Sequence, residues 1–325
     1  MDGVNRPRLA PNWTTLAGAI EGVLEAMAAP LPRHAVMGLT GCAFTFALAR
    51  SETGVAGAAG IHAFDTIRLE ERLARTGVRF ERFLGGRAER RDAIAWMTAR
   101  TARGTPVVAW ALRLREWGIV QAVDEAAQTF AVDDLLTPEV GPSAAWDDWP
   151  WAGERVDLLA PVGHGVEEDA LEAVTAALRD AAAFLSGEIR PEGMPSGADA
   201  LEEWAAAFEE GSPIDRSGNA YCLAALEAAR SDGAAFLEEL AQALSNTAEP
   251  LRRAAAALRR EAAELSQLVT LFPYPAGGAG ALTSPGMRRI AAAVLRRAAR
   301  WEREAAQAAA AAAAGLSSAS GSSAG

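Results

Sequence analysis

Apolar residues in the second half of the chain recur at helical spacing. Leu171, Val174, Leu178 and Leu185 lie three, four or seven positions apart, which places them on one side of a helix. Similar patterns follow, separated by links rich in Gly, Pro and Ser, over residues 198–210, 218–244, 248–272 and 284–307. Short links favour antiparallel packing of neighbouring helices, so the pattern predicts an all-α bundle of about five helices over residues 165–307.

The first half has short apolar and β-branched runs separated by turns. Such runs predict strands, here over residues 77–85, 105–114, 155–163 and 117–134, the last as two strands joined by a turn at Asp124 to Ala127. Two helices are expected among them: one from Trp13 to Met27, capped by Asn12, and one that ends at Gly104. Residues 1–164 are therefore expected to form an α+β domain.

Two further segments are interpreted from composition. "LRRAAAALRREAAEL", residues 251–265, alternates arginines with glutamates and is typical of a solvated helix face. The low-complexity end from Ala308, "AAAAAAAGLSSASGSSAG", predicts a fraying alanine helix and a disordered tail over residues 308–325.

Charge and hydropathy narrow the class of function. The net charge of -11 and the pI near 5.0 argue against a nucleic-acid partner. The chain contains no lysine, which excludes Schiff-base chemistry and a P-loop lysine. No apolar run reaches the roughly 18 to 20 residues of a membrane span, and the first residues lack the pattern of a signal peptide. We therefore expect a cytoplasmic protein with no membrane partner.

A cysteine and a histidine in the first half offer one candidate for covalent chemistry. Cys42 in "GLTGCAF" is the only plausible nucleophile there, His62 is its best base by position, and Asp65 is three residues further on, where it can orient the imidazole. The alternative is that Cys42 fills space in the core. The histidines are isolated and no Cys or His pair has metal-ligand spacing, so no metal and no cofactor is expected.

Two other stretches suggest binding surfaces. "WDDWPW", residues 146–151, combines acidic and tryptophan side chains, which predicts either a surface for a sugar or a cation or a linker whose aromatic rings hold the two halves together. In "GNAYCLAALEAAR", Asn219 is interpreted as a helix cap. Tyr221 and the other polar residues of this helix point either into a cleft between the domains or into solvent.

Four stretches in this order resemble one family: "GLTGCAF", "GTPVVAWALRLREWGIVQAVDE", "GNAYCLAALEAAR" and "LVTLFPYP". The family is a bacterial group that joins a papain-like domain to a C-terminal helical domain. The papain-like half is similar to the N-terminal domain of butirosin biosynthesis protein H and, more distantly, to bacteriocin-processing cysteine peptidases. The resemblance spans roughly residues 12–275. It implies a papain-like, cysteine-peptidase-type fold followed by the helical bundle.

The resemblance also implies where catalytic groups would lie. Active relatives hold a cysteine at the start of the first helix and a histidine at the start of a strand of the type "H-x-V-V-x-x-G-Y-D". Here Trp13 or Thr14 stands near the cysteine position, and Glu116 of "EWGIVQAVD" stands at the histidine position. A glutamate can act as a base, but acyl transfer then has no thiol nucleophile. The resemblance therefore implies the fold without the activity.

These observations lead to three hypotheses. The first is a non-catalytic papain-like protein that binds a small molecule or peptide between its domains. Glu116 and Trp117 together would then form an anionic and aromatic clamp for a cationic or amino-bearing ligand. The alternative is that Glu116 is an exposed residue at the strand end, paired with Arg113 or Arg115. The candidate ligand-binding residues are Trp13, Thr14, Trp110, Glu116, Trp117, Asn219 and Tyr221. The second hypothesis is a cysteine-dependent acyltransferase or peptidase that uses Cys42, His62 and Asp65. The third is a structural protein that forms a homodimer through its bundle.

Overall fold

The chain forms two compact units. A computed structural model describes residues 6–151, 154–165 and 170–322. The sheet unit consists of Met1–Val36 and Glu70–Glu168, and the helical unit of Met37–Leu69 and Asp169–Gly325. The chain passes from the sheet unit to the helical unit for the last time between residues 168 and 169, close to the domain boundary expected after residue 164. The segment Met37–Leu69, however, groups with the helices rather than with the rest of the first half.

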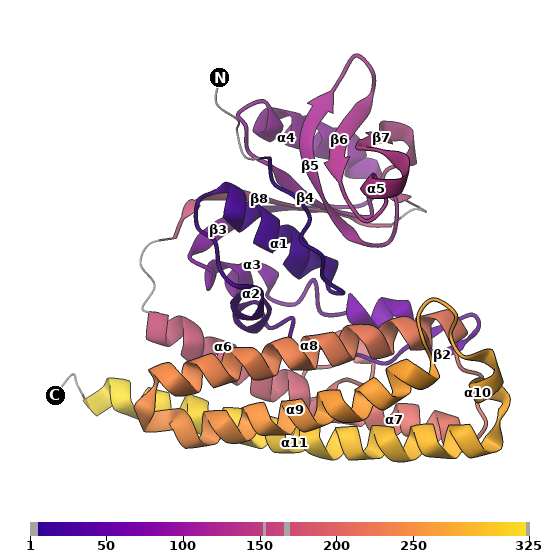
Figure 1. The fold of residues 1–325 in the computed structure, drawn as a ribbon. Coiled ribbons are helices and arrows are strands. Elements are labelled where there is room, and N and C mark those ends of the chain that lie inside the picture. The colour runs from indigo at the N-terminus through magenta and orange to yellow at the C-terminus, as the bar shows by residue number, and fades with distance from the viewer. Residues whose placement is uncertain (1–5, 152–153, 166–169, 323–325) are drawn as a thin grey trace. The chain divides into compact units, whose positions relative to one another are not determined.

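The sheet unit is built on a six-stranded antiparallel sheet (Figure 1). Strands β5 and β6 form the expected hairpin, in which Asp124 pairs with Thr129. The last strand of the unit, β8, lies inside the sheet between β3 and β4. The order across the sheet is β3 (Val78–Gly85), β8 (Val156–His164), β4 (Val107–Trp110), β5 (Trp117–Asp124), β6 (Thr129–Asp133) and β7 (Ser143–Ala145).

Helices pack on both faces of this sheet because strand side chains alternate between the faces. Helix α4 (Arg90–Thr101) buries Ile94 and Met97 in one core with Val107, Ala109 and Val120. Helix α1 (Thr15–Ala26) contacts β4 and β5 on the other face. The short helices of the first half are α2 (Arg33–Leu39), α3 (Leu69–Ala74) and α5 (Thr137–Val140).

The cap expected for the first helix is wrong. Asn12 Oδ1 accepts a hydrogen bond from Thr14 N at 3.0 Å, and α1 begins only at Thr15. Asn12 therefore closes a turn before the helix. Its side chain does not reach the first free N–H groups of α1, because the helix starts two residues later than the apolar pattern indicates.

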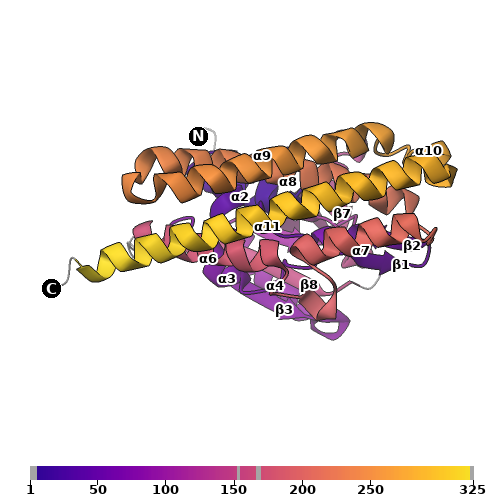
Figure 2. The same ribbon diagram turned by 90° about the horizontal axis from the view of Figure 1, so that it is seen from below.

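The helical unit is a bundle, as the sequence predicts. Helix α11 packs along α6, α7 and α9, and α8 packs along α9 (Figures 1 and 2). Each helix buries its apolar stripe against its neighbours. The helices are α6 (Ala170–Ser186), α7 (Gly197–Glu209), α8 (Arg216–Ala243), α9 (Ala248–Leu271), α10 (Ala279–Thr283) and α11 (Pro285–Ser322).

The alanine-rich end differs from the disordered tail that composition predicts. Helix α11 continues to Ser322, and the segment after residue 307 buries Ala308, Ala309, Ala312, Ala313 and Leu316. Alanine has the highest helix propensity and loses no side-chain entropy when it is ordered. Its small side chain also lets helices approach closely, so this low-complexity segment contributes a packed face.

Segment 37–69 belongs to the helical unit because its aromatic side chains and backbone bind there. Phe46 stacks on Trp204 with ring centroids 5.5 Å apart, and Phe64 meets Phe184 edge-on at 5.1 Å. The hairpin of β1 (Ala49–Ser51) and β2 (Gly54–Gly57) is attached by a hydrogen bond from Val55 N to Pro213 O, 3.0 Å long.

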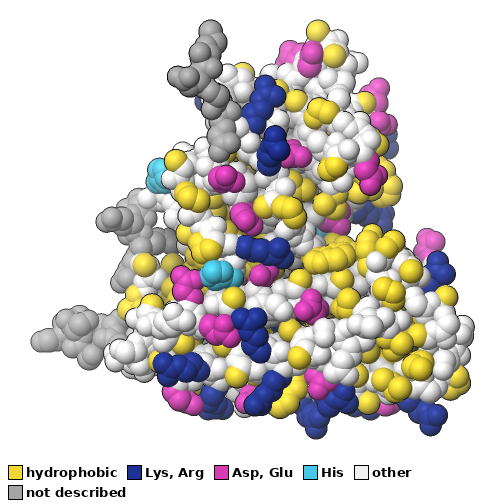
Figure 3. Space-filling model, in the orientation of Figure 1, with side chains coloured by type: hydrophobic (Ala, Val, Ile, Leu, Met, Phe, Trp, Pro, Cys, Tyr) yellow, Lys and Arg dark blue, Asp and Glu magenta, His cyan; other side chains and the backbone are white. Residues whose placement is uncertain are grey.

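The surface of the helical unit carries arginine and acidic side chains intermingled (Figure 3). Several of them form ion pairs between helices, such as Arg296 with Glu209 at 2.6 Å and Arg259 with Glu238 at 2.8 Å. Among the described helices, none has the length and apolar character needed to cross a membrane.

Candidate functional site

A buried hydroxyl and a carboxylate meet where the first helix approaches the sheet. Thr15 Oγ1 donates to Glu116 Oε2 at 2.6 Å and accepts from Trp117 N at 3.0 Å. Thr15 is the first residue of α1, and Glu116 directly precedes β5. Thr15 is 1% exposed, whereas Glu116 is half-buried. One short hydrogen bond thus joins the start of α1 to the residue that precedes β5, the two places to which the family resemblance points.

The residue at this contact is one position beyond those predicted. Trp13 is half-buried and Thr14 is buried, but the hydroxyl that reaches Glu116 belongs to Thr15. The sequence offered a weak signal for it, since Thr14 and Thr15 are adjacent and only the start of the helix decides which one faces the strand. The late start of α1 selects Thr15.

Trp110 and Trp117 belong to the core. They are partners in the β4–β5 register, and their rings pack against each other with centroids 5.6 Å apart. Trp110 is 3% exposed and Trp117 is fully buried, while Trp110 Nε1 donates to Glu154 Oε2 at 3.2 Å. Cross-strand aromatic pairs of this kind stabilise a sheet. Both rings are therefore packed in the core of the sheet unit, and their role in ligand binding stays a prediction.

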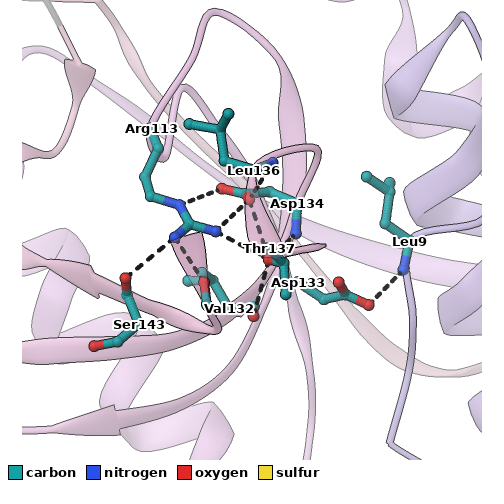
Figure 4. Close-up of polar contacts among 9 residues, drawn as sticks. Leu9, Arg113, Val132, Asp133, Asp134, Leu136, Thr137 and Ser143 are labelled. Carbon is teal, nitrogen blue, oxygen red and sulfur yellow. Dashed lines mark hydrogen bonds and ion pairs between the residues drawn. The ribbon is translucent and has the colours of Figure 1, made fainter. Parts of the chain in front are cut away.

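The two arginines near Glu116 have other partners. Arg115 Nε lies 2.7 Å from Glu154 Oε1. The Arg113 guanidinium donates to the Asp134 carboxylate, to Thr137 Oγ1 and to the carbonyl oxygens of Gly141 and Ser143, and Figure 4 shows most of this network. These contacts, together with the bond from Thr15, favour a specific placement of Glu116 over a surface pairing with Arg113 or Arg115.

Asn219 and Tyr221 belong to the helical unit, whereas Thr15 and Glu116 belong to the sheet unit. Asn219 is fully buried in the first turn of α8 and accepts from Trp204 Nε1 at 3.2 Å. The cap of α8 is Asp215, whose side chain accepts from Gly218 N at 2.8 Å. The prediction that Asn219 caps this helix is therefore wrong, because α8 begins at Arg216, three residues before Asn219.

Cys42, His62 and Asp65 also belong to the helical unit. The expected orienting contact is present, with His62 Nδ1 3.1 Å from Asp65 Oδ2 and both side chains buried. Cys42 is 3% exposed and forms no disulfide. The three residues thus lie in a different unit from the helix and strand that the papain-like resemblance points to.

We expect both cysteines to react slowly with iodoacetamide in the native protein and rapidly in urea. Burial raises the pKa of the Cys222 thiol well above its usual range, and the low exposure of Cys42 restricts access of the reagent. Mass spectrometry of alkylated peptides measures both rates. Rapid alkylation of Cys42 at pH 6 that disappears in a His62→Ala variant would instead support the cysteine-dependent enzyme.

Residues 146–151 lie within the sheet unit and do not link the two units. Trp149 is buried in the α4 core, and its Nε1 donates to Trp110 O at 3.0 Å. Strand β8 follows this segment and pairs inside the same sheet, which rules out the linker interpretation.

No cluster of acidic, histidine and cysteine side chains able to hold a metal ion occurs within the described ranges. Comparison of the chain with protein-family models and with curated proteins gave no match. The candidate site therefore stands on its own geometry: a hydroxyl at the start of a helix, bonded to a carboxylate at the start of a strand.

Proposed function

We propose that the sheet unit is a papain-like scaffold without its catalytic pair, and that the protein binds a small molecule or peptide without transforming it. The observation that supports this most directly is the hydrogen bond between Thr15 and Glu116. In the resembled family these two places, the start of the first helix and the start of a strand, hold the cysteine and the histidine.

The chemistry of the pair argues against acyl transfer. An alcohol is a weak nucleophile unless a base takes its proton, and it must also reach the substrate. The Thr15 oxygen is buried, accepts one N–H and donates to the carboxylate. These bonds are suited to holding α1 against β5, a structural role that leaves the hydroxyl poorly accessible to an acyl group.

The carboxylate favours a cationic or amino-bearing ligand. Glu116 is half-buried, so its negative charge is only partly screened by water, and a ligand ammonium or guanidinium can form a charge-assisted hydrogen bond with it. Trp13, two residues before Thr15 and also half-buried, is the tryptophan of the candidate set best able to contribute an aromatic surface.

Native mass spectrometry of the full chain purified from its native host tests the proposal. We expect an amine-bearing compound to co-purify with the protein and to be lost from a Glu116→Gln variant, which keeps the shape of the side chain and removes its charge. Glu125→Gln, at an exposed position in the β5–β6 turn, is the matched control and should retain the compound. Absence of a bound compound, or equal retention by Glu116→Gln, contradicts the proposal.

Thr15→Val is expected to lower the free energy of unfolding by about 1–3 kcal/mol, because it leaves the Trp117 N–H and the Glu116 carboxylate without their buried partner. Thr15→Ser keeps the hydroxyl and should cost much less. Urea denaturation followed by circular dichroism measures the difference. Hydrolysis of 4-nitrophenyl acetate that Thr15→Ser preserves and Thr15→Val abolishes would replace this structural role by a catalytic one.

A further inference from the structure

A cavity of about 640 Å³ opens beside the N-terminal end of α4, within the sheet unit. Three arginines, two aspartates and an apolar group line it: Arg87, Arg90, Arg113, Asp147, Asp148, Trp149, Pro150 and Trp151. A second hollow of about 380 Å³ shares Arg87, Arg90 and Asp147 with it. The volume is that of a typical small-molecule site. Neither Thr15 nor Glu116 lines this cavity, so it is a site separate from that pair.

The arginines that line the cavity differ in how many hydrogen bonds and ion pairs their side chains already make. The Arg113 guanidinium donates to Asp134, Thr137 and two backbone carbonyls, as Figure 4 shows in part. Its positive charge is therefore already balanced by the Asp134 carboxylate. Arg87 is exposed, and its side chain makes no hydrogen bond or ion pair with the other residues that the structure describes. Arg87 and Arg90 are therefore the cations that a ligand can recruit.

Two buried donors on residues that line the second hollow lack acceptors. Arg90 Nε and Trp146 Nε1 are both buried and make no hydrogen bond within the described part of the chain. The two residues are also neighbours, since Arg90 Nη2 donates to Trp146 O. A buried N–H without an acceptor is unfavourable, because it has lost its hydrogen bond to water. Neither atom has accessible surface in this arrangement, so a ligand acceptor reaches them only after these side chains shift.

The acidic side chains do not cancel this preference. The Asp147 side chain is 97% exposed and lies 3.6 Å from Arg90 Nη2, so water screens its charge and the pair is weak. Asp148 is exposed as well. Pro150 and the 39%-exposed Trp151 add an apolar wall on which a planar group can pack.

We propose that this cavity binds an organic anion, a carboxylate or phosphate monoester carried on a planar apolar body. The anionic oxygens pair with the guanidinium groups of Arg87 and Arg90, while the body packs against Trp151. This site is independent of the proposed function at Glu116, and its ligand has the opposite charge.

Isothermal titration calorimetry of the full chain at low salt tests the proposal with phenyl phosphate, benzoate, inorganic phosphate and phenol. We expect phenyl phosphate or benzoate to bind, and both inorganic phosphate and phenol to bind at least about tenfold more weakly, because each lacks one of the two recognised parts. No binding of either organic anion, or equal binding of phenol or of inorganic phosphate, overturns the proposal.

Variants identify the cavity as the place of binding. Arg90→Gln should weaken the organic anion at least about tenfold. Arg87→Gln should weaken it too, and because this side chain is exposed and unpaired among described residues, that variant keeps the fold if Arg90→Gln does not. Arg103→Gln, an exposed arginine of the same unit outside the cavity, should bind as the wild type does. Unchanged binding in Arg87→Gln, or an equal loss in Arg103→Gln, contradicts the assignment.

Discussion

Arg230→Met is expected to lower the free energy of unfolding of the helical unit by about 3–5 kcal/mol, the typical cost of breaking a buried ion pair by removing one partner. Arg230 of α8 is fully buried. Its Nε lies 3.0 Å from Glu261 Oε1 of α9, and its Nη2 lies 2.6 Å from Glu302 Oε1 of α11. Both glutamates are also fully buried.

The size of this effect follows from what the variant leaves behind. One guanidinium holds together three helices and also donates to Ala43 O at 2.8 Å. Without it, two acidic groups stay in a region of low polarity with no cation, and each then has to be neutralised or hydrated. Loss of packing alone would cost less, because methionine fills most of the same space.

Urea unfolding followed by circular dichroism measures the change. Arg259→Met is the matched control, since Arg259 makes a similar two-point contact with Glu238 between α8 and α9 but both side chains are exposed. That surface pair should contribute roughly 0–1 kcal/mol. A triple variant, Arg230→Met with Glu261→Leu and Glu302→Leu, should recover much of the loss. Equal destabilisation by the two single arginine variants would show that burial of the triad is unimportant.

Glu261→Gln is expected to stabilise the helical unit increasingly as the pH rises above about 4.5. Burial raises the pKa of Glu261 well above its usual range, and the neighbouring Glu302 carboxylate raises it further, although Arg230 acts in the opposite direction. With one arginine facing two carboxyl groups, the folded triad retains a proton that the unfolded chain releases. Glutamine keeps the shape and a hydrogen-bond donor but has no proton to lose.

The direction follows from proton linkage. A group whose folded pKa is raised stabilises the fold fully below its unfolded pKa, and this stabilisation is lost as the pH rises through the folded pKa. In that window the wild type loses up to about 1.4 kcal/mol per pH unit from this residue. The difference between Glu261→Gln and the wild type should widen by the same amount and become constant once the folded group ionises.

Urea unfolding at a series of pH values measures this difference, and Glu264→Gln provides a control of opposite sign. Hydrogen bonding to Arg297 lowers the pKa of Glu264, so its stabilisation is present above its unfolded pKa and is lost on acidification. The two positions are three residues apart on α9. A Glu261→Gln difference that does not vary with pH would mean that this carboxyl is already ionised at the acidic end of the range.

Both of these glutamates lie in one segment, and its sequence pattern does not distinguish the buried one from the one near the surface. Residues 251–265 are typical of a solvated face, and Glu264 behaves as expected, paired with Arg297 near the surface. Glu261 is instead fully buried, because α9 turns that position toward Arg230 and Glu302. An acidic residue in an arginine-rich helix gives no sign of its depth when its partners are 31 and 41 positions away.

At the candidate site the prediction from the sequence was in error by one residue. The family resemblance pointed to the start of α1 and to Glu116, and both lie at the contact. It named Trp13 or Thr14 rather than Thr15, because an apolar pattern locates a helix end only within a few residues. The cavity residues Arg87 and Arg90 carried no signal, since isolated arginines are usually solvated.

The sequence alone predicted the long helices of the bundle, α1, α4 and most strands of the six-stranded sheet, but not α2, the hairpin of β1 and β2 or the packed helix after residue 307. Periodicity and turn residues act locally, and they were sufficient for the hairpin of β5 and β6 and for the long helices of the bundle. Only the tertiary structure decided that segment 37–69 packs with those helices, that Glu261 is buried and that Thr15 meets Glu116. Each of these depends on contacts between residues far apart along the chain, and burial and pKa arise from such contacts rather than from local pattern.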